Sequence, residues 1–358
     1  MRVGVVGLGR IGRMHARNFA QTDAVEEVLL IGRDPDRTAA ALADVRASVQ
    51  PGAPAVLAGH HAPASGAAPL RATTTELATA LREVDAVVLA TSTATHPELT
   101  LLAARAGVPT LVEKPLALDP AQLRTLSDDI GKTGTDVAVA FHRRYDPAHQ
   151  RLREHVRNGD VGTVRLMRAA GHDHLPPPAD YIATSGGIWR DMLVHDFDSI
   201  PWIAGERVVR VVSTGSVLED PRYADYDDVD TCAVILTLES GAIATVTGSR
   251  HNGAGQDVRL EVCGTENCYA VGIDDATALT STEPGVAAPA RAYEEFVDRF
   301  EIAFRAEAAH FVRMASGNAP NLTPPRAGLH AVEVAVAATT SARTGLPVTI
   351  PTTPTTNS

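Results

Sequence analysis

The sequence predicts an α/β protein in which an N-terminal doubly wound domain with a parallel sheet is followed by an α+β domain with a large open, mostly antiparallel sheet. Two observations support this fold class. Short apolar runs alternate with helical segments through the first third of the chain, and after Asp146 the runs follow one another through short turns. The length of 358 residues allows two domains, expected over residues 1–142 and 143–351, before a low-complexity tail over residues 352–358 that should be flexible.

Five apolar runs in the first third are expected to form the parallel strands. They are short and rich in Val, Leu and Ala, which is typical of strands buried on both faces. The runs are Val3–Val6, Val28–Ile31, Ala86–Ala90, Thr110–Val112 and Val137–Phe141. Helical patterns between them include Arg13–Phe19, Glu98–Ala106 and Pro120–Ile130. The Pro-, Gly- and Ala-rich segment Gln50–Ala68 has neither periodicity and is expected to be a surface loop.

Five later runs have the composition of strands joined by hairpin turns. They are Gly162–Ala170, Val208–Val217, Thr231–Leu238, Ala242–Thr247 and Val258–Val262. Glu239-Ser240-Gly241 and Gly264-Thr265-Glu266-Asn267 are typical of hairpin turns, which favour antiparallel pairing. The helical patterns expected to cover one face of this sheet are Met192–Ala204, Phe296–Ala315 and Gly328–Thr344.

The composition favours small molecules over nucleic acid or a membrane as partners. The formal net charge is -11, whereas nucleic acid and anionic membranes require a basic surface. No uninterrupted apolar stretch reaches about 18 residues, and Arg10 and Arg13 interrupt the N-terminus before a signal-peptide core could form, so we expect a cytoplasmic protein. The 3 cysteines lack a second Cys or His pair at zinc-ligand spacing, so no metal site is expected.

A glycine motif, G-x-G-x-x-G, directly follows the first apolar run and precedes a helical segment. Glycines at these positions permit a tight turn and the close approach of a pyrophosphate to the backbone and to the helix N-terminus. The first domain is therefore expected to be a dinucleotide-binding Rossmann domain. The residues expected to contact the cofactor here are Gly7, Gly9, Arg10, Ile11 and Gly12.

The residues after the second expected strand favour NADP over NAD. Sheets that bind NAD commonly carry an acid there, which accepts the ribose 2′-hydroxyl, but this chain has Gly32-Arg33. Arg33, assisted by Arg37, can bind a 2′-phosphate. The alternative is that Arg33 is a solvated surface residue and Asp34 binds the ribose, which would keep NAD possible.

Three further motifs occur in a specific order. Glu113-Lys114-Pro115 follows the expected strand Thr110–Val112, Phe141 to Asp146 reads FHRRYD, and Ser185 to Asp198 reads SGGIWRDMLVHDFD. Together with the glycine motif they resemble the Gfo/Idh/MocA oxidoreductase family, and the resemblance extends from Val3 to about Ile350. Within the family, the stretch from His174 to Asp198 is similar to inositol 2-dehydrogenases.

The resemblance implies a set of site residues. Lys114, Asp191 and His195 would form the catalytic triad, and these three together with Arg144 and His174 would bind the substrate. The alternatives are a salt-bridged core cluster for the triad and a structural role for His174.

The resemblance also places Thr91, His96, Glu113 and Lys114 beside the cofactor. A role in capping the helix that starts near Pro97 is an equally good interpretation of Thr91 and His96.

The oxidation of a secondary alcohol explains these residue types. Asp191 and His195 are four residues apart, so on one helix they would project from the same face. A neutral imidazole at His195 suits the role of base near pH 7. Lys114 would stabilise the developing alkoxide, and Asp191 would hold a substrate hydroxyl or orient the imidazole.

The predicted function is that of an NAD(P)-dependent oxidoreductase, with NADP favoured, acting on a cyclic polyol or sugar and resembling inositol dehydrogenases. Inositol dehydrogenases often carry Tyr-Gly-Tyr-Asp where this chain has Ala254-Gly255-Gln256-Asp257, and an acid where it has Ala327, so the substrate stays open. The alternatives are an NAD-assisted glycoside hydrolase of the same superfamily and a non-catalytic NADP-binding regulator. A homodimer or homotetramer is expected, because the family commonly forms them and an open sheet offers a face for self-association.

Overall fold

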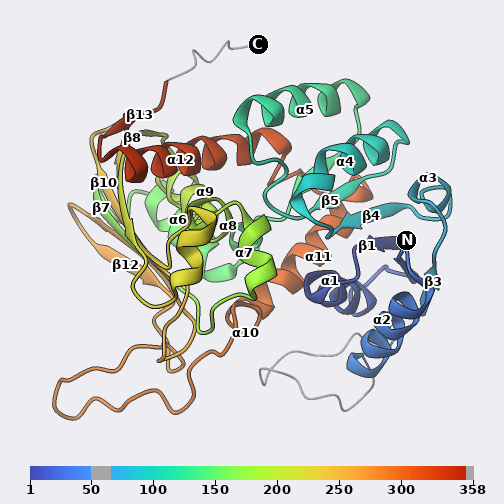
Figure 1. The fold of residues 1–358 in the computed structure, drawn as a ribbon, viewed down its shortest axis with the longest axis horizontal. Helices are drawn as coiled ribbons and strands as arrows, with labels where there is room; N and C mark the ends of the chain where they lie inside the picture. The colour runs from blue at the N-terminus through green and yellow to red at the C-terminus, as the bar shows by residue number, and fades with distance from the viewer. Residues whose placement is uncertain (50–65, 352–358) are drawn as a thin grey trace. The chain divides into compact units, whose positions relative to one another are not determined.

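The computed structural model describes residues 1–49 and 66–351, and the chain divides into two compact units (Figure 1). The first unit consists of Met1–Tyr145 and Glu301–Leu329, and the second consists of Asp146–Phe300 and the chain from His330 onward. Each unit therefore contains two separate stretches of the chain, whereas the sequence order places Glu301–Leu329 in the second domain. The expected tail over 352–358, and residues 50–65 of the expected loop, lie outside the described residues.

The first unit is built on a parallel sheet of 6 strands in the order β3-β2-β1-β4-β5-β6. The strands are β1 Arg2–Val6, β2 Glu27–Ile31, β3 Leu70–Thr73, β4 Ala86–Leu89, β5 Thr110–Val112 and β6 Val137–Val139. The five expected strands are confirmed, and β4, β5 and β6 are completely buried as their apolar composition indicates. Strand β3 was not expected from the sequence, because only Leu70 of this edge strand is buried and its apolar signal is weak.

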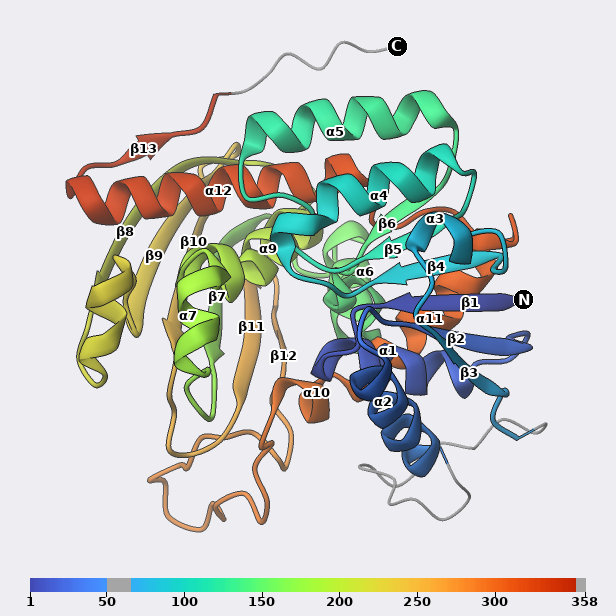
Figure 2. The ribbon, with the colours of Figure 1, turned by 45° about the vertical axis from the view of Figure 1, so that its right-hand side comes forward.

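Helices cover both faces of this sheet, with α1 and α2 on one side and α4 and α5 on the other (Figure 2). Their bounds are α1 Arg10–Ala20, α2 Pro35–Ser48, α3 Leu77–Ala80, α4 His96–Arg105, α5 Pro120–Thr133 and α11 Glu301–Ala315, with 3-10 turns at Thr93–Thr95 and His142–Tyr145. Asp34 and Asp119 begin α2 and α5 as N-caps, each followed by a proline. Helix α11 completes the core beside α1, where the rings of Phe19 and Phe311 meet edge to face at 5.8 Å.

The second unit is built on a sheet of 7 strands in the order β12-β11-β7-β10-β9-β8-β13. The strands are β7 Val164–His172, β8 Val208–Ser216, β9 Thr231–Leu238, β10 Ile243–Ser249, β11 Asp257–Gly264, β12 Cys268–Val271 and β13 Val348–Thr349. All neighbours are antiparallel except β7 and β10, which are parallel. Both expected hairpins are present, joining β9 to β10 and β11 to β12, so the expected, mostly antiparallel sheet is confirmed.

One face of this second sheet is covered by helices α6, α9 and α12, and the other face is open (Figure 1). The helices are α6 Pro147–Arg157, α7 Ala179–Ser185, α8 Ile188–Asp191, α9 Val194–Ala204, α10 Phe296–Arg299 and α12 Pro325–Thr344, with a 3-10 helix at Pro221–Tyr226. Burial alternates along β9, where Val234 and Leu236 are buried and Ile235 between them is 48% exposed. No helix in residues 1–49 and 66–351 combines the length and apolar character needed to cross a membrane.

One expected helix is present with a start two residues later, and another is interrupted. The expected helix Met192–Ala204 is preceded by the separate short helix α8, and α9 starts at Val194. The expected helix Phe296–Ala315 is divided into α10 and α11 at Phe300, whose backbone leaves the helical region with φ -115° and ψ 19°. Apolar periodicity continues across the break at Phe300, which is why the sequence pattern does not reveal it.

Candidate active site

The turn after β1 has the geometry that a dinucleotide requires. Gly7 has a φ of +88°, and a Cβ there would lie 2.4 Å from the carbonyl oxygen of Ala90. A Cβ at Gly12 would lie 1.8 Å from the carbonyl oxygen of Gly7, so α1 can pack this close to the turn only with glycine at that position. Gly9 differs from both, because a Cβ there would meet no atom of residues 1–49 and 66–351 within 4 Å. The space beside Gly9 is therefore open to a ligand that approaches the backbone.

Helix α1 begins at this open space. Gly9 is its N-cap, and its first turn contains no acidic residue. The unpaired N–H groups and partial positive charge at such a helix end attract an anionic pyrophosphate. The turn and the first turn of α1 contain all the residues expected to contact the pyrophosphate, namely Gly7, Gly9, Arg10, Ile11 and Gly12. Their arrangement fits a dinucleotide.

Of the residues after β2, Asp34 caps a helix and Arg33 lies at the surface. Asp34 caps α2, and its carboxylate accepts the backbone N–H of Arg37 at 2.8 Å. Arg33 is exposed, and its guanidinium has no ion pair or hydrogen bond within residues 1–49 and 66–351. Gly32 has no room for a side chain, because a Cβ there would lie 1.9 Å from Oγ1 of Thr38. Thr38 thus occupies the space that an acidic side chain at Gly32 would need.

His96 connects the loops that follow β4 and β5. Its buried ring lies with Nδ1 2.9 Å from the carbonyl oxygen of Pro115 and Nε2 3.1 Å from the carbonyl oxygen of Thr91. The Thr91 hydroxyl lies 2.7 Å from that of Thr95, and the N-cap Thr95 makes no side-chain capping bond to α4. Burial, the largest effect, lowers the pKa of His96. These side chains hold two loops together and do not cap the helix.

Glu113 and His15 form a close pair behind the Glu-Lys-Pro motif. Oε1 of Glu113 lies 2.7 Å from Nε2 of His15, which is buried on α1, and Oε2 accepts the backbone N–H of Lys114 at 3.2 Å. Burial alone would raise the pKa of Glu113, but the interactions with His15 and Lys114 outweigh it and lower that pKa. Lys114 follows β5 directly, and its peptide bond to Pro115 is cis.

A second acid, Glu307 on α11, is affected by the charge of Glu113. Glu307 is 1% exposed, and neither of its carboxyl oxygens has a hydrogen-bond partner among the described residues. Burial raises the pKa of Glu307 well above its usual value, and the charge of Glu113 adds to the effect. Burial without a partner therefore favours the neutral form of Glu307. Glu307 was not expected from the sequence, because it lies in no motif and its helix belongs to the late part of the chain.

The expected substrate contacts are divided between the two units. Lys114 and Arg144 belong to the first unit, and His174, Asp191 and His195 belong to the second. Arg144 is buried in the 3-10 turn after β6, where Nη1 donates to the carbonyl oxygen of Leu322 at 3.0 Å.

Asp191 is held from two sides. Its Oδ2 accepts a hydrogen bond from Nη1 of Arg250 at 2.8 Å, and its Oδ1 accepts one from the Tyr181 hydroxyl at 2.8 Å. Arg250 directly follows β10 and is 2% exposed, whereas Tyr181 lies on α7. Arg250 was not expected from the sequence, because it is 59 residues from Asp191 along the chain.

His195 lies near the start of α9, beyond the turn that separates α8 from α9. The backbone of the intervening Met192 remains in the αR region with φ -93° and ψ -57°, but the N–H of Leu193 bonds to the carbonyl of Ile188, five residues earlier. Asp191 ends α8, so the expected pair does not lie on one continuous helix. The side chain of His195 is partly exposed.

His174 lies in the loop after β7, next to Asp173. Its Nδ1 is 3.0 Å from the carbonyl oxygen of Glu294, and its backbone N–H donates to Oε1 of Gln256. Nε2 of Gln256 donates to Oδ1 of Asp173 at 3.0 Å, and Oδ2 of Asp173 lies 4.0 Å from Nη1 of Arg250. His174 is thereby linked to Asp191 through Gln256, Asp173 and Arg250.

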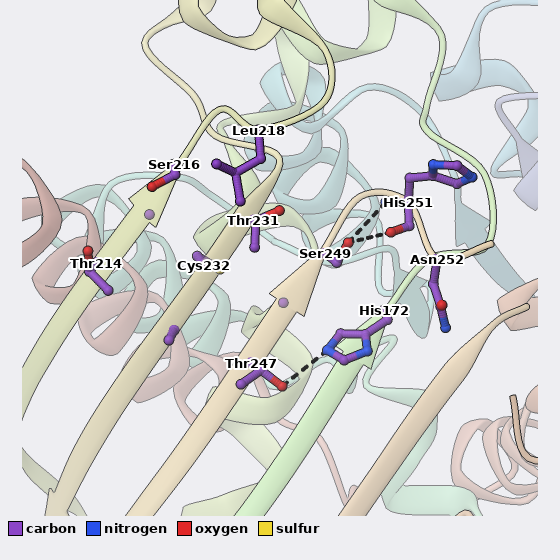
Figure 3. Close-up of a pocket in the computed structure, with 13 residues that line it drawn as sticks. His172, Thr214, Ser216, Leu218, Thr231, Cys232, Thr247, Ser249, His251 and Asn252 are labelled. Carbon is purple, nitrogen blue, oxygen red and sulfur yellow. Dashed lines mark hydrogen bonds between the residues drawn. The ribbon is translucent and has the colours of Figure 1, made fainter. Parts of the chain in front are cut away.

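A pocket of about 480 Å³ lies at the ends of β7 to β10, and we call it the sheet-face pocket (Figure 3). Side chains with hydroxyl groups and two histidines line it, including Thr214, Ser216, Thr231, Thr247, Ser249, His172 and His251. Nε2 of His172 lies 3.1 Å from Oγ1 of Thr247. None of the site residues expected from the sequence lines this pocket.

Two of the three cysteines are joined in a disulfide that the sequence analysis did not predict. Cys263 and Cys268 face one another across β11 and β12 and are bonded. They form, with Glu261, the only group within the described residues whose ligand atoms are close enough to hold a metal ion. The two sulfurs bind each other and Glu261 pairs with Arg168, so this group is committed to other contacts.

Comparison with known families matches both parts of the chain. Residues 1–141 match an oxidoreductase family with an NAD-binding Rossmann fold, and residues 149–270 match the GFO/IDH/MocA C-terminal domain. Together these matches cover well over half of the chain.

The chain is also similar over most of its length to individual dehydrogenases. It is 34% identical over 352 residues to the myo-inositol dehydrogenase Hyg17 of Streptomyces leeuwenhoekii, covering 96% of this chain and 98% of that protein. It is 33% identical over 332 residues to a myo-inositol 2-dehydrogenase of Thermotoga maritima, covering 89% and 90%. A crystal structure of a myo-inositol dehydrogenase from Corynebacterium glutamicum has a TM-score of 0.82 at 29% identity, covering 99% of both chains.

Proposed function

Because the chain belongs to the Gfo/Idh/MocA oxidoreductase family, we propose that it is an NADP-preferring dehydrogenase that acts on a secondary alcohol or ketone of a cyclic polyol or sugar. The observation that carries the proposal is that the carboxylate of Asp191 accepts hydrogen bonds from Arg250 and Tyr181. The chain that carries this arrangement is similar to inositol dehydrogenases over most of its length. A carboxylate held in this way, close in sequence to the partly exposed His195, suits proton transfer to and from a hydroxyl.

The first unit supplies the cofactor site in this proposal. The open space at Gly9 and the start of α1 would bind the pyrophosphate, and the loops carrying Thr91, His96 and Glu113 would flank the cofactor. The exposed Arg33 supports NADP, since its guanidinium is available to a 2′-phosphate. When bound, the nicotinamide supplies the exchange of hydride with the substrate carbon.

Residues of the chain would accept the proton and stabilise the negative charge that develops on the substrate oxygen. His195 accepts the hydroxyl proton as a neutral imidazole, because imidazole is the side chain best suited to proton transfer near neutral pH. Lys114 donates to the oxygen that becomes negative, and Asp191 accepts a hydrogen bond from a neighbouring substrate hydroxyl. Arg144 and His174 complete the proposed contacts to a substrate with adjacent hydroxyl groups.

The open face of the second sheet supports self-association. Ile235 on β9 and Ile243 on β10 are 48% and 45% exposed, and the half-buried Val212 on β8 pairs with Ile235 in register. Exposed apolar side chains on neighbouring strands are typical of a surface that another subunit covers. We propose a homo-oligomer formed through this face.

A steady-state assay tests the proposed reaction. Purified protein is supplied with NADP or NAD and a panel of inositols, pyranoses and keto-sugars, and kcat/KM is measured in both directions. We expect turnover of a neutral polyhydroxylated ring. Turnover restricted to acidic or phosphorylated compounds would contradict the substrate class. Release of sugar without net NADPH formation would identify the NAD-assisted hydrolase instead.

Variants of the proposed triad test the roles of the residues. Lys114→Met and His195→Ala are each expected to lower kcat by about 10² to 10⁴ without a comparable loss of NADP affinity, since they remove proton-transfer or charge-stabilising groups. A near-normal kcat in folded His195→Ala protein would mean that His195 is a structural residue and not the base. If the parent protein binds the cofactor but turns over no substrate, and neither variant changes that binding, the non-catalytic regulator would be favoured.

A further inference from the structure

Arg250 is a buried cation surrounded by carboxylates of the second unit. It is 2% exposed, and its guanidinium lies 2.8 Å from Asp191 and 4.0 Å from both Asp173 and Asp228. Burial disfavours its charge, but the nearby carboxylates outweigh burial and raise the pKa of Arg250. The residue is therefore a permanent positive charge in a site with little water.

The three carboxylates are not equivalent partners of Arg250. Oδ1 of Asp228 accepts the backbone N–H of Ile188 at 2.9 Å, and Oδ1 of Asp173 accepts the Gln256 amide at 3.0 Å. Both lie too far from Arg250 for a direct hydrogen bond, whereas Asp191 is within hydrogen-bond distance. Of the three carboxylates, Asp191 is therefore the one that accepts a charge-assisted hydrogen bond directly from Arg250.

The backbone of Arg250 fixes where this contact is made. Its N–H donates to the carbonyl oxygen of Asp230 at 2.8 Å, just before β9 begins, so the residue is anchored to the neighbouring strand. Tyr181 donates to the other oxygen, so the carboxylate of Asp191 is hydrogen-bonded by two residues, Tyr181 and Arg250, that are far apart in sequence. Two bonds on different oxygens restrict rotation of the carboxylate about its last side-chain bond.

We propose that Arg250 is the positioning residue of the active site, which acts through Asp191 by fixing the direction of its carboxylate toward the substrate. This inference rests on the proposed function, because it requires Asp191 to contact substrate. Through Asp173 and Gln256 the same cation is linked to the loop that carries His174. A single buried guanidinium thereby supports two of the proposed substrate contacts.

A double-mutant cycle on kcat/KM tests this proposal. Asp191→Asn, Arg250→Met and the double variant are compared with the parent protein. A misdirected catalytic group typically costs about 100-fold in rate, so we expect each single variant to lose about that much. If Arg250 acts through Asp191, the double variant should be no more than about threefold slower than the slower single variant. A merely structural arginine would not show this dependence on Asp191.

Two further variants keep the test decisive. Arg250→Lys retains the charge but not the planar fork, and we expect it to keep more activity than Arg250→Met with unchanged affinity for NADPH. It replaces Arg250→Met in the cycle if the latter does not fold. Arg259→Met is the matched control, because Arg259 on β11 also pairs with an aspartate, Asp257, and within residues 1–49 and 66–351 it makes no hydrogen bond or ion pair with Asp191. The fold-loss of kcat/KM caused by Arg259→Met should multiply with the fold-loss caused by Asp191→Asn when the two substitutions are combined.

The outcomes separate this proposal from the proposed function. Losses that multiply in the double variant, or a folded Arg250→Met protein as active as the parent, would overturn the role of Arg250 while Asp191 remained essential. Full activity in Asp191→Asn would reject Asp191 as a substrate contact, and with it this inference. Absence of turnover by the parent protein with every polyol and sugar of the panel would instead reject the proposed function.

Discussion

The carbonyl oxygen of Gly7 occupies the position that a side chain at Gly12 would need, only 1.8 Å from an added Cβ, whereas no atom of the described residues lies within 4 Å of a Cβ added at Gly9. The three glycines of one motif therefore have different physical roles. Gly7 and Gly12 are required by the fold, and Gly9 is free for the ligand.

Alanine substitutions at Gly12 and Gly9 should separate these roles. Gly12→Ala is expected to lower the free energy of unfolding by about 1–3 kcal/mol, because the turn and α1 must move apart. Gly9→Ala is expected to change it by less than about 1 kcal/mol, since an N-cap with φ -73° accepts alanine, but to weaken NADPH binding at least about tenfold. Chemical denaturation and fluorescence titration measure the two effects. Equal losses of stability in the two variants would contradict this division.

The exposed Arg33 should determine the preference for NADP. A charge-assisted hydrogen bond contributes about 1.5–3 kcal/mol, so Arg33→Ala is expected to weaken NADPH binding by about 10- to 100-fold and to leave NADH binding nearly unchanged. Arg82→Ala, another exposed arginine of the first unit, serves as the control. Gly32→Asp should favour NAD only when combined with Thr38→Ala, because Thr38 blocks a side chain at Gly32. Parent protein that binds NADH as tightly as NADPH would reject this role for Arg33.

Glu307 should make the first unit less stable as the pH rises. Its pKa is raised in the folded protein by burial and by the charge of Glu113, so above about pH 4.5 the folded state binds more protons than the unfolded state. The free energy of unfolding then falls with pH, by up to about 1.4 kcal/mol per pH unit for one proton. Glu307→Gln removes this dependence and is expected to stabilise the protein increasingly as the pH rises above about 4.5.

Denaturant titrations at several pH values measure the effect of Glu307→Gln. Glu301→Gln on the same helix is the control, because Glu301 is also buried but is paired with Arg305 at 2.7 Å, and its loss should destabilise the protein. An unchanged pH dependence in Glu307→Gln would mean that Glu307 is not held neutral.

The apolar open face of the second sheet should be the surface of self-association. Ile235→Glu and Ile243→Glu place charges on neighbouring strands of that face and are expected to shift the protein toward monomer. Light scattering after size-exclusion chromatography, at several concentrations, gives the molar mass. Leu279→Glu is the control, because Leu279 is 57% exposed but lies outside the strands. A parent protein that is monomeric throughout, or variants with the parent's mass, would contradict the proposed interface.

Much of the fold could be predicted because burial imposes a local pattern. Strands β4, β5 and β6 have continuous apolar sequences because both of their faces are covered, and β9 alternates because only one face is. Edge strands carry little of this signal, since β3 has one buried residue and β13 is two residues long. The break at Phe300 was equally hidden, because a fully buried apolar residue fits either a helix or its end.

The candidate site shows a similar limit. Asp191 and His195 could be found from their spacing and their motif, but the residues that hold Asp191 could not. Arg250 reaches it from the end of β10, and this contact depends on how α8 packs against the sheet and not on any local sequence pattern. Glu307 is a similar case, because it is buried without a hydrogen-bond partner among the described residues, and this burial follows from the packing of α11 into the first unit.

The return of Glu301–Leu329 to the first unit has a consequence for synthesis on the ribosome. The nucleotide-binding half of the protein emerges first, but part of its core, including Phe311 and Met314, is among the last segments to be translated. During most of elongation the chain must therefore leave the apolar surface around Phe19 uncovered, including while the whole segment Asp146–Phe300 is being made. A nascent chain stalled before residue 301 should consequently bind chaperones through its N-terminal part, although that part carries every residue of the glycine motif.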